Sequence, residues 1–73
     1  LLVFPNPAED LLNITTDADL SNSVVSVFDV AGQRVLTTTL RNGQLDISAL
    51  NSGLYLLQVQ GQNGTQQRKF TKR

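Results

Sequence analysis

Apolar residues in this sequence recur mostly at every second position, in short segments, and no helical spacing continues for ten residues. Segments rich in β-branched and aromatic residues are separated by glycine, proline and asparagine, which is typical of strands joined by turns. The expected strands are residues 1–4, 11–16, 24–31, 34–40, 44–47, 54–61 and 65–72. Without helical intervals between them, these strands predict a small antiparallel, immunoglobulin-like β-sandwich of about seven strands, with closure into a barrel as a minor alternative.

Three segments have the residues that tight turns require. Ala31-Gly32-Gln33 and Asn42-Gly43 suit short hairpins, and Gly61 to Gly64 places two glycines where positive φ is useful. Pro5-Asn6-Pro7 is a different kind of turn, because each proline fixes φ, removes a backbone donor and favours extended geometry in the residue before it. We expect it to form a rigid corner between the first two strands.

Alternation also predicts which side chains form the core. Tyr55, Leu57 and Val59 share one face of their strand and should point at the opposite sheet, with the Tyr55 hydroxyl at the rim. Leu12, Ile14 and Phe70 are the best candidates in the second and last strands. Residues 24–30 are apolar on both faces, as expected of a central strand, so their register is ambiguous.

Composition limits the function classes. The 73 residues suffice for one domain, residues 1–73, which buries only roughly 60% of the surface that its unfolded chain exposes. Six basic and six acidic side chains balance, so no field of one sign favours nucleic acid. No apolar run approaches the ~20 residues that cross a bilayer, so we expect no direct membrane insertion. The chain starts within a strand pattern and without methionine, and we expect it to end a longer polypeptide.

Few side chains in this sequence could act in catalysis or bind a metal. The sequence has no histidine and no cysteine, which leaves the carboxylate pairs Glu9 with Asp10 and Asp17 with Asp19 as the only acid–base candidates. Both pairs lie in polar stretches beside strand ends, where solvated turn carboxylates are common. The second pair lacks the spacing of a calcium loop. We therefore expect no enzyme activity, no catalytic residue, no metal and no cofactor.

Four motifs occur in a fixed order along the chain. They are Val3-Phe4-Pro5-Asn6-Pro7, Val27-Phe28-Asp29-Val30-Ala31-Gly32, Leu50-Asn51-Ser52-Gly53-Leu54-Tyr55 and the terminal Lys69-Phe70-Thr71-Lys72-Arg73. Each alone is an ordinary feature of a β-sandwich. In this order they resemble the type A C-terminal sorting domain of cargo proteins of the type IX secretion system of Bacteroidetes. The likeness covers nearly the whole chain.

The resemblance implies a non-enzymatic address that directs its parent protein across the outer membrane of a Gram-negative bacterium, by way of the periplasm. The implied partners are the type IX translocon, an outer-membrane shuttle protein and a sortase-like cysteine peptidase at the cell surface, which cuts upstream of Leu1. The sorting-signal residues implied are Pro5, Asn6, Pro7, Gly32, Leu50, Gly53 and Tyr55. The basic end of the chain, Lys69, Phe70, Lys72 and Arg73, would be recognised by the translocon through an acidic groove or by strand addition.

Two other classes of module are compatible with the strand pattern. A carbohydrate-binding sandwich normally exposes aromatic rings for sugar stacking, whereas the aromatic residues here are mostly needed for the core. A fibronectin III-like spacer, packed against a neighbouring catalytic domain, needs no special residue. The terminal strand also has a purely structural interpretation, because lysines on an edge strand discourage pairing with other sheets.

Overall fold

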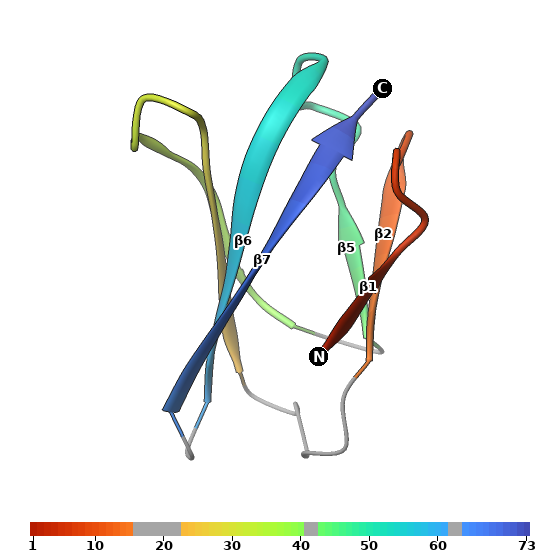
Figure 1. Cartoon of the computed structure of the whole chain (residues 1–73). Helices are drawn as coiled ribbons and strands as arrows, with labels where there is room; N and C mark the ends of the chain where they lie inside the picture. Colours follow the sequence, from red (N-terminus) through yellow and green to blue (C-terminus); the bar gives the residue numbers. More distant parts are fainter. Residues whose placement is uncertain (16–22, 41–42, 62–63) are drawn as a thin grey trace.

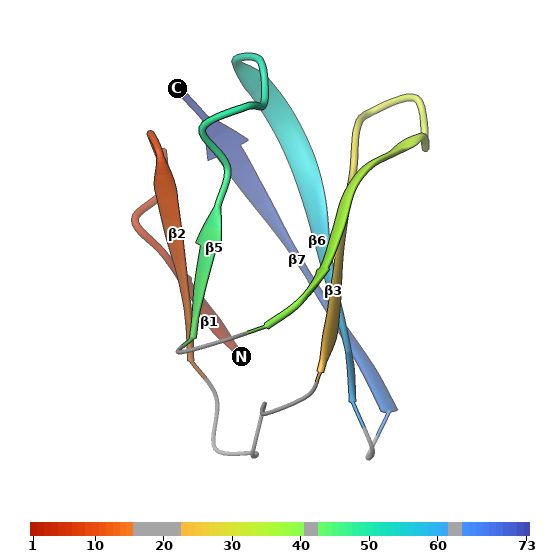
Figure 2. The same cartoon turned by 180° about the vertical axis from the view of Figure 1, so that it is seen from behind.

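The computed structural model describes residues 1–15, 23–40, 43–61 and 64–73, and arranges them as two antiparallel sheets packed face to face (Figures 1 and 2). The strands are β1 (Leu2–Phe4), β2 (Leu11–Thr15), β3 (Val24–Phe28), β4 (Arg34–Thr39), β5 (Gln44–Asp46), β6 (Gly53–Gly61) and β7 (Gly64–Lys72). The predicted all-β sandwich is confirmed. Two separate sheets replace the alternative of a closed barrel.

The smaller sheet has the order β1-β2-β5 and the larger has the order β4-β3-β6-β7. The chain therefore changes sheet between β2 and β3, between β4 and β5, and again between β5 and β6, as in immunoglobulin-like folds. β6 and β7 form the longest pair, with register running from Gly53↔Lys72 to Gly61↔Gly64. β7 is consequently an edge strand, as the structural interpretation of its lysines requires.

The core lies between the two sheets and contains every side chain that alternation assigned to it. Leu12 and Ile14 from β2 and Val25 and Val27 from β3 all belong to this buried cluster, so the inward face of β3 is the Val25 and Val27 face. The other fully or nearly fully buried apolar residues are Ala8, Leu40, Leu45, Ile47, Tyr55, Leu57, Val59 and Phe70. Alternation succeeds because each strand has one face against the opposite sheet.

The β3–β4 hairpin is closed by one aspartate and one glycine. The Asp29 N–H donates to the Gln33 carbonyl at 2.9 Å, and Gly32 N–H donates to the Asp29 carbonyl at 3.0 Å. Gly32 has φ of 86°, a region that residues with a Cβ rarely occupy. The Asp29 carboxylate accepts from the N–H groups of Ala31 and Gln33, both at 2.9 Å. The predicted strand 24–31 therefore ends at Phe28, because Asp29 bonds within the turn instead of to a neighbouring strand.

Several other predicted boundaries shift by one residue. The predicted strands 34–40 and 44–47 end at Thr39 and Asp46, and the last two strands begin one residue earlier than expected, at Gly53 and Gly64. Gly43 has the positive φ, 67°, that a hairpin position requires. Thr16, Asp17, Asp19, Asn42 and the Gln62-Asn63 turn lie outside the described residues.

Candidate recognition site around the C-terminal strand

The motifs that are far apart in the sequence converge at one end of the sandwich. The Pro5–Pro7 turn, the Gly32 hairpin, the segment that precedes β6 and the C-terminal residues all lie at the upper end in both views (Figures 1 and 2). This follows from the strand directions. β3 and β7 both finish at this end of the sandwich, and β6 begins there. Motifs that are separated along the chain therefore lie at the same end of the folded domain.

The proline turn is bonded to the end of β7 as well as joining β1 to β2. The Thr71 N–H donates to Asn6 Oδ1 at 2.9 Å, and Ala8 N–H donates to the Thr71 carbonyl at 2.8 Å. The Arg73 N–H donates to the Ala8 carbonyl at 2.7 Å, so Ala8 forms a short parallel bridge with Lys72. Ala8 is fully buried, whereas Pro5, Asn6 and Pro7 are exposed. The corner therefore fixes the backbone of the terminal residues.

The Leu50–Tyr55 segment supports β7 from its other side. The Tyr55 ring stacks on the Phe70 ring with centroids 5.7 Å apart, and the two residues are directly opposite each other in the β6–β7 register. The Tyr55 hydroxyl donates to the Asn51 carbonyl at 2.7 Å, which ties the ring to the turn four residues upstream. This arrangement resembles the tyrosine corner of immunoglobulin-like domains. The ring is buried and the hydroxyl is satisfied at the rim, as predicted.

Leu50 belongs to the turn that leads into β6, and Gly53 begins this strand just before Tyr55. Leu50 is half-buried against the core, and its N–H donates to the Ile47 carbonyl at 3.0 Å. Just before this turn, Asp46 Oδ1 accepts from the Ser48 N–H at 2.9 Å, and hydrogen bonds from Ser48 hold the pKa of the Asp46 carboxyl below its ordinary value. Gly53 has φ of 156° and pairs with Lys72 at the start of β6.

We call Asn6, Ala8, Tyr55, Phe70 and Thr71 the strand-end cluster. Its members come from β6, β7 and the turn between β1 and β2, and each contacts or belongs to the last four residues of β7 or the segment bonded to them. Sequence analysis named Asn6, Tyr55 and Phe70. It missed Ala8, because a lone alanine after a proline turn has no distinguishing pattern.

The predicted recognition residues at the basic end differ sharply in exposure. Lys69 and Arg73 are exposed, whereas Phe70 is only 1% exposed and Lys72 only 8%. Phe70 points into the core, so in the folded domain it offers no surface to a partner, contrary to the expectation of a direct anchor. Lys72 shares the inward face of β7 with Phe70, and its ammonium donates to the Arg73 carbonyl at 3.1 Å.

The proline turn is hydrogen-bonded to the outer edge of β7 only near the C-terminal end of the strand. Both backbone groups of Thr71 bond to the proline turn, and in an antiparallel strand every second residue points its N–H and C=O to the same side. Thr65, Gln67 and Lys69 therefore point their backbone groups toward this edge. Arg68 covers part of it: its guanidinium donates to the Gln67 carbonyl at 2.8 Å and, through Nε, to the Leu1 carbonyl at 3.2 Å, which links β7 to the chain start.

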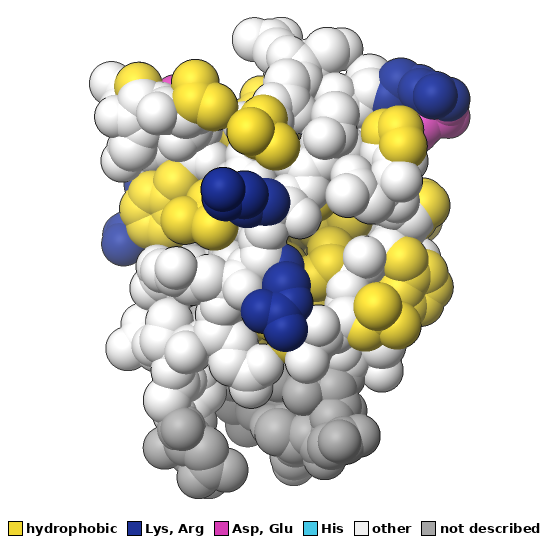
Figure 3. All heavy atoms as spheres, in the orientation of Figure 1, with side chains coloured by type: hydrophobic (Ala, Val, Ile, Leu, Met, Phe, Trp, Pro, Cys, Tyr) yellow, Lys and Arg dark blue, Asp and Glu magenta, His cyan; other side chains and the backbone are white. Residues whose placement is uncertain are grey.

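The described charges are unevenly distributed between the two sheets although the sequence is neutral overall. The described basic residues, Arg34, Arg68, Lys69, Lys72 and Arg73, all lie on or directly after strands of the larger sheet. Glu9 and Asp10 precede β2 and Asp46 ends β5, both in the smaller sheet, whereas Asp29 lies in the β3–β4 turn of the larger sheet. Figure 3 shows Lys and Arg side chains across the middle of the face that presents β7 and β1, with apolar side chains between them.

No group of three or more metal-ligating side chains occurs among the described residues, and no described helix could span a membrane.

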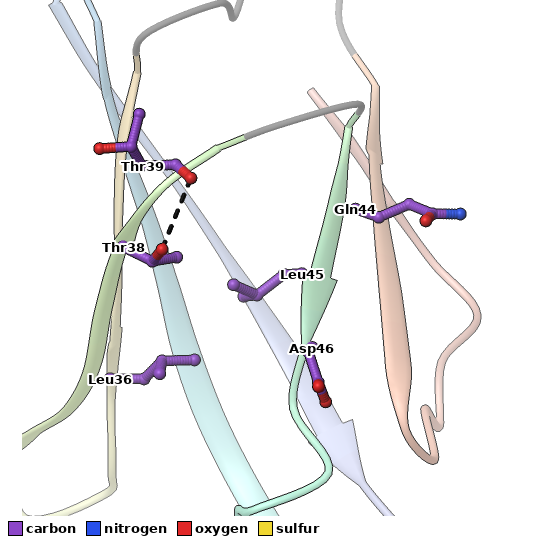
Figure 4. Close-up of a pocket in the computed structure, with 6 residues that line it drawn as sticks. All are labelled: Leu36, Thr38, Thr39, Gln44, Leu45 and Asp46. Atoms are coloured by element: carbon purple, nitrogen blue, oxygen red, sulfur yellow. Dashed lines mark hydrogen bonds between the residues drawn. The ribbon is translucent and has the colours of Figure 1, made fainter.

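A hollow of about 450 Å³ opens between β4 and β5 (Figure 4). Leu36 and Leu45 point toward each other across it, Thr38 and Thr39 border it, and Gln44 points away. Asp46 is the one carboxylate among these lining residues. Glu9 and Asp10, the described carboxylate pair, are both exposed beside the proline turn.

These features are those of a small recognition module: a two-sheet sandwich whose distinctive residues converge on one basic edge strand. Comparison with known proteins identifies the module. The family model described as "Secretion system C-terminal sorting domain" matches residues 2–73, and the chain belongs to this family. It is a sorting signal for type IX secretion, a role that implies export to the cell surface or beyond and interaction with that secretion system. A sorting-signal domain is not catalytic.

A curated relative from Wenyingzhuangia aestuarii, named "Funoran endo-beta-hydrolase", is 33% identical over 63 residues. The matched region covers 82% of this chain and 9% of that protein. The chain thus spans a small part of its relative.

Proposed function

We propose that this domain works as a folded address that the type IX translocon reads in the periplasm of a Gram-negative bacterium. The parent protein then crosses the outer membrane, an outer-membrane shuttle protein collects it, and a sortase-like cysteine peptidase at the surface removes the domain by cutting upstream of Leu1. Membership of the sorting-domain family supports the overall role. The particular partners and the order of steps are our proposal.

The observation that carries this proposal is the bonding of the proline turn to the last residues of β7. Asn6 and Ala8 satisfy both backbone groups of Thr71 and the N–H of Arg73. Such hydrogen bonds hold the last residues of β7 in one backbone conformation, whereas chain ends without such bonds are poorly ordered. A receptor that reads the basic end then meets a preorganised surface, and binding loses less conformational entropy.

The predicted recognition residues take two different roles in this proposal. Lys69 and Arg73 are exposed, so their charges are available to an acidic partner surface. Phe70 and Lys72 are buried, and they act by holding β7 against β6 and the core. Pro5, Asn6, Pro7, Gly32, Leu50, Gly53 and Tyr55 shape the turns around this end and so position the exposed charges.

The test is the delivery of a reporter. Residues 1–73, preceded by a linker, are fused to a periplasmic reporter in a type IX-competent strain, and surface reporter is measured by protease accessibility of intact cells. We expect the unmodified tail to deliver the reporter. Retention behind the outer membrane would refute the address function for this chain.

The role of the folded end is tested with Asn6→Ala, which removes the acceptor for Thr71 N–H. The matched control is Asn13→Ala, which removes an exposed side-chain hydrogen bond from Gln44 Nε2 to Asn13 Oδ1, 3.3 Å, on the other sheet. We expect Asn6→Ala to reduce delivery and Asn13→Ala to leave it unchanged. Equal delivery by the two variants would show that the bonded turn is not part of the signal. Deleting Phe70 to Arg73 is a poorer test, because it also removes a core side chain.

A further inference from the structure

One row of side chains crosses all four strands of the larger sheet near the end of the sandwich at which β7 terminates, which we call the signal end. The register pairs Arg34 of β4 with Phe28 of β3, Phe28 with Leu56 of β6, and Leu56 with Lys69 of β7. All four lie on the outer face, opposite the buried Val27, Leu57 and Phe70 face. We call these four residues the cationic row. A cation stands at each end, and two apolar side chains lie between them.

The centre of the cationic row is accessible apolar surface. The Arg34 guanidinium lies 5.5 Å from the centroid of the Phe28 ring, which fixes this cation beside an aromatic face. Phe28 and Leu56 are half-buried. Leu54 and Val30 next to them are 49% and 81% exposed. A shallow hollow of about 240 Å³ is lined by Asp29, Val30, Leu54, Tyr55, Leu56 and Lys69.

Acidic side chains are missing from the outward positions of these four strands. Toward the other end of the same face, the outward residues of β6 and β7 are neutral and polar: Gln58, Gln60, Gln67 and Thr65. Asp29 borders the hollow, but its carboxylate already accepts two backbone N–H groups of the hairpin. The combination of two cations and exposed apolar side chains is therefore confined to the signal end, and it is complementary to an acidic, partly apolar ligand.

We propose that the cationic row docks an extended acidic segment of a secretion-apparatus protein, with an apolar side chain between two carboxylates. Three strand spacings of ~4.8 Å separate Arg34 from Lys69 by about 14 Å. In an extended peptide, residues i and i+4 lie about 13 Å apart and point to the same side, as does residue i+2 between them. A segment with the pattern acidic-x-apolar-x-acidic, crossing the strands, places its carboxylates at Arg34 and Lys69 and its apolar side chain on Phe28 and Leu56.

This inference rests on the proposed function, and the delivery experiment separates the two. The test variant is Arg34→Glu/Lys69→Glu, which reverses both ends of the row. The control is Gln58→Glu/Gln67→Glu, which places two carboxylates on the same face at directly paired positions and lowers the net charge by two, as does the milder test variant Arg34→Gln/Lys69→Gln. We expect the test variant to lose delivery and the control to keep it, with both purified fusions showing the same melting temperature. Failure of the unmodified tail refutes the address function, whereas equal delivery by the two double variants refutes the docking row alone.

A direct binding measurement makes the ligand class explicit. The probe is a synthetic peptide, Glu-Thr-Leu-Thr-Glu, titrated into the full chain and followed by NMR, with Lys-Thr-Leu-Thr-Lys as the reversed-charge control. We expect shifts at Phe28, Leu56 and Lys69 with the acidic peptide, and a Kd about tenfold or more weaker for Arg34→Glu/Lys69→Glu. Shifts spread over the smaller sheet, or equal binding of both peptides, would overturn the proposal. If the reversed variant does not fold, Arg34→Gln/Lys69→Gln replaces it with the same expected direction.

Discussion

The two edge strands of the larger sheet, β7 and β4, differ in what bonds or covers their outward backbone groups. Both have a row of backbone groups that no further strand of the sheet pairs. At the end of β7, the proline turn bonds Thr71 and Arg73, and Arg68 reaches across to Leu1. β4 begins with Arg34 and continues Val-Leu-Thr-Thr-Thr, and its register with β3 is shifted between Val27 and Phe28, which is the mark of a β-bulge.

The difference shows which edge the domain holds in place. Leu40 N–H donates to the Ser23 carbonyl, so even-numbered residues of β4 bond to β3 and the backbone groups of Thr37 and Thr39 point outward. β7 is fixed from three sides at its end: by β6, by the core through Phe70, and by the proline turn. Order is thus concentrated at the end of β7, where we propose that the sorting signal is read.

The largest expected effect comes from removing the core contact of β7. Phe70→Ala deletes a buried ring that stacks on Tyr55, and we expect a loss of about 3–5 kcal/mol in the free energy of unfolding. On β4, Val35→Ala truncates a side chain that is 39% exposed, and should cost no more than about 0.5 kcal/mol. Urea unfolding of both variants measures the difference. Similar midpoints would mean that β7 is no better anchored than β4.

A smaller effect is expected when only the edge bond is removed. Asn6→Ala should cost about 1 kcal/mol and speed hydrogen exchange at the Thr71 amide, because its acceptor is lost. In the unmodified chain, Thr71 and Arg73 should exchange more slowly than the outward amides of Thr37 and Thr39. Exchange at Thr71 that is unchanged by Asn6→Ala would contradict the role given to this bond.

The smallest effect concerns Asp46, which lies beside the β4–β5 hollow. Because the folded state holds its pKa below the ordinary value of 3.8, this carboxyl stabilises the fold above that pH. As the pH falls through the lowered pKa, the stabilisation disappears. Asp46→Asn should therefore show a flatter decline of stability below about pH 4 than the unmodified chain, by thermal melting. Parallel curves of stability against pH for the two proteins would show that Asp46 makes no pH-dependent contribution to the fold.

Sequence patterns predicted the strands and the core because these depend on local alternation. Leu12, Ile14 and Phe70 each follow a period of two, and the structure buries all three. The end of β3 at Phe28 was missed because Asp29 bonds within its own turn, which alternation does not reveal. Ala8 was missed for a different reason: its burial depends on a strand that starts 56 residues later in the chain.

By itself, the sequence determined the all-β class, the turn positions and the motifs that place the chain among sorting domains, because strand alternation and turn chemistry are local properties. Only the tertiary structure decided that the proline turn bonds to Thr71, that Lys72 is buried while Lys69 is exposed, and that Arg34 and Lys69 bracket one apolar row. These facts depend on the order and register of the strands, which bring together residues that no local pattern relates.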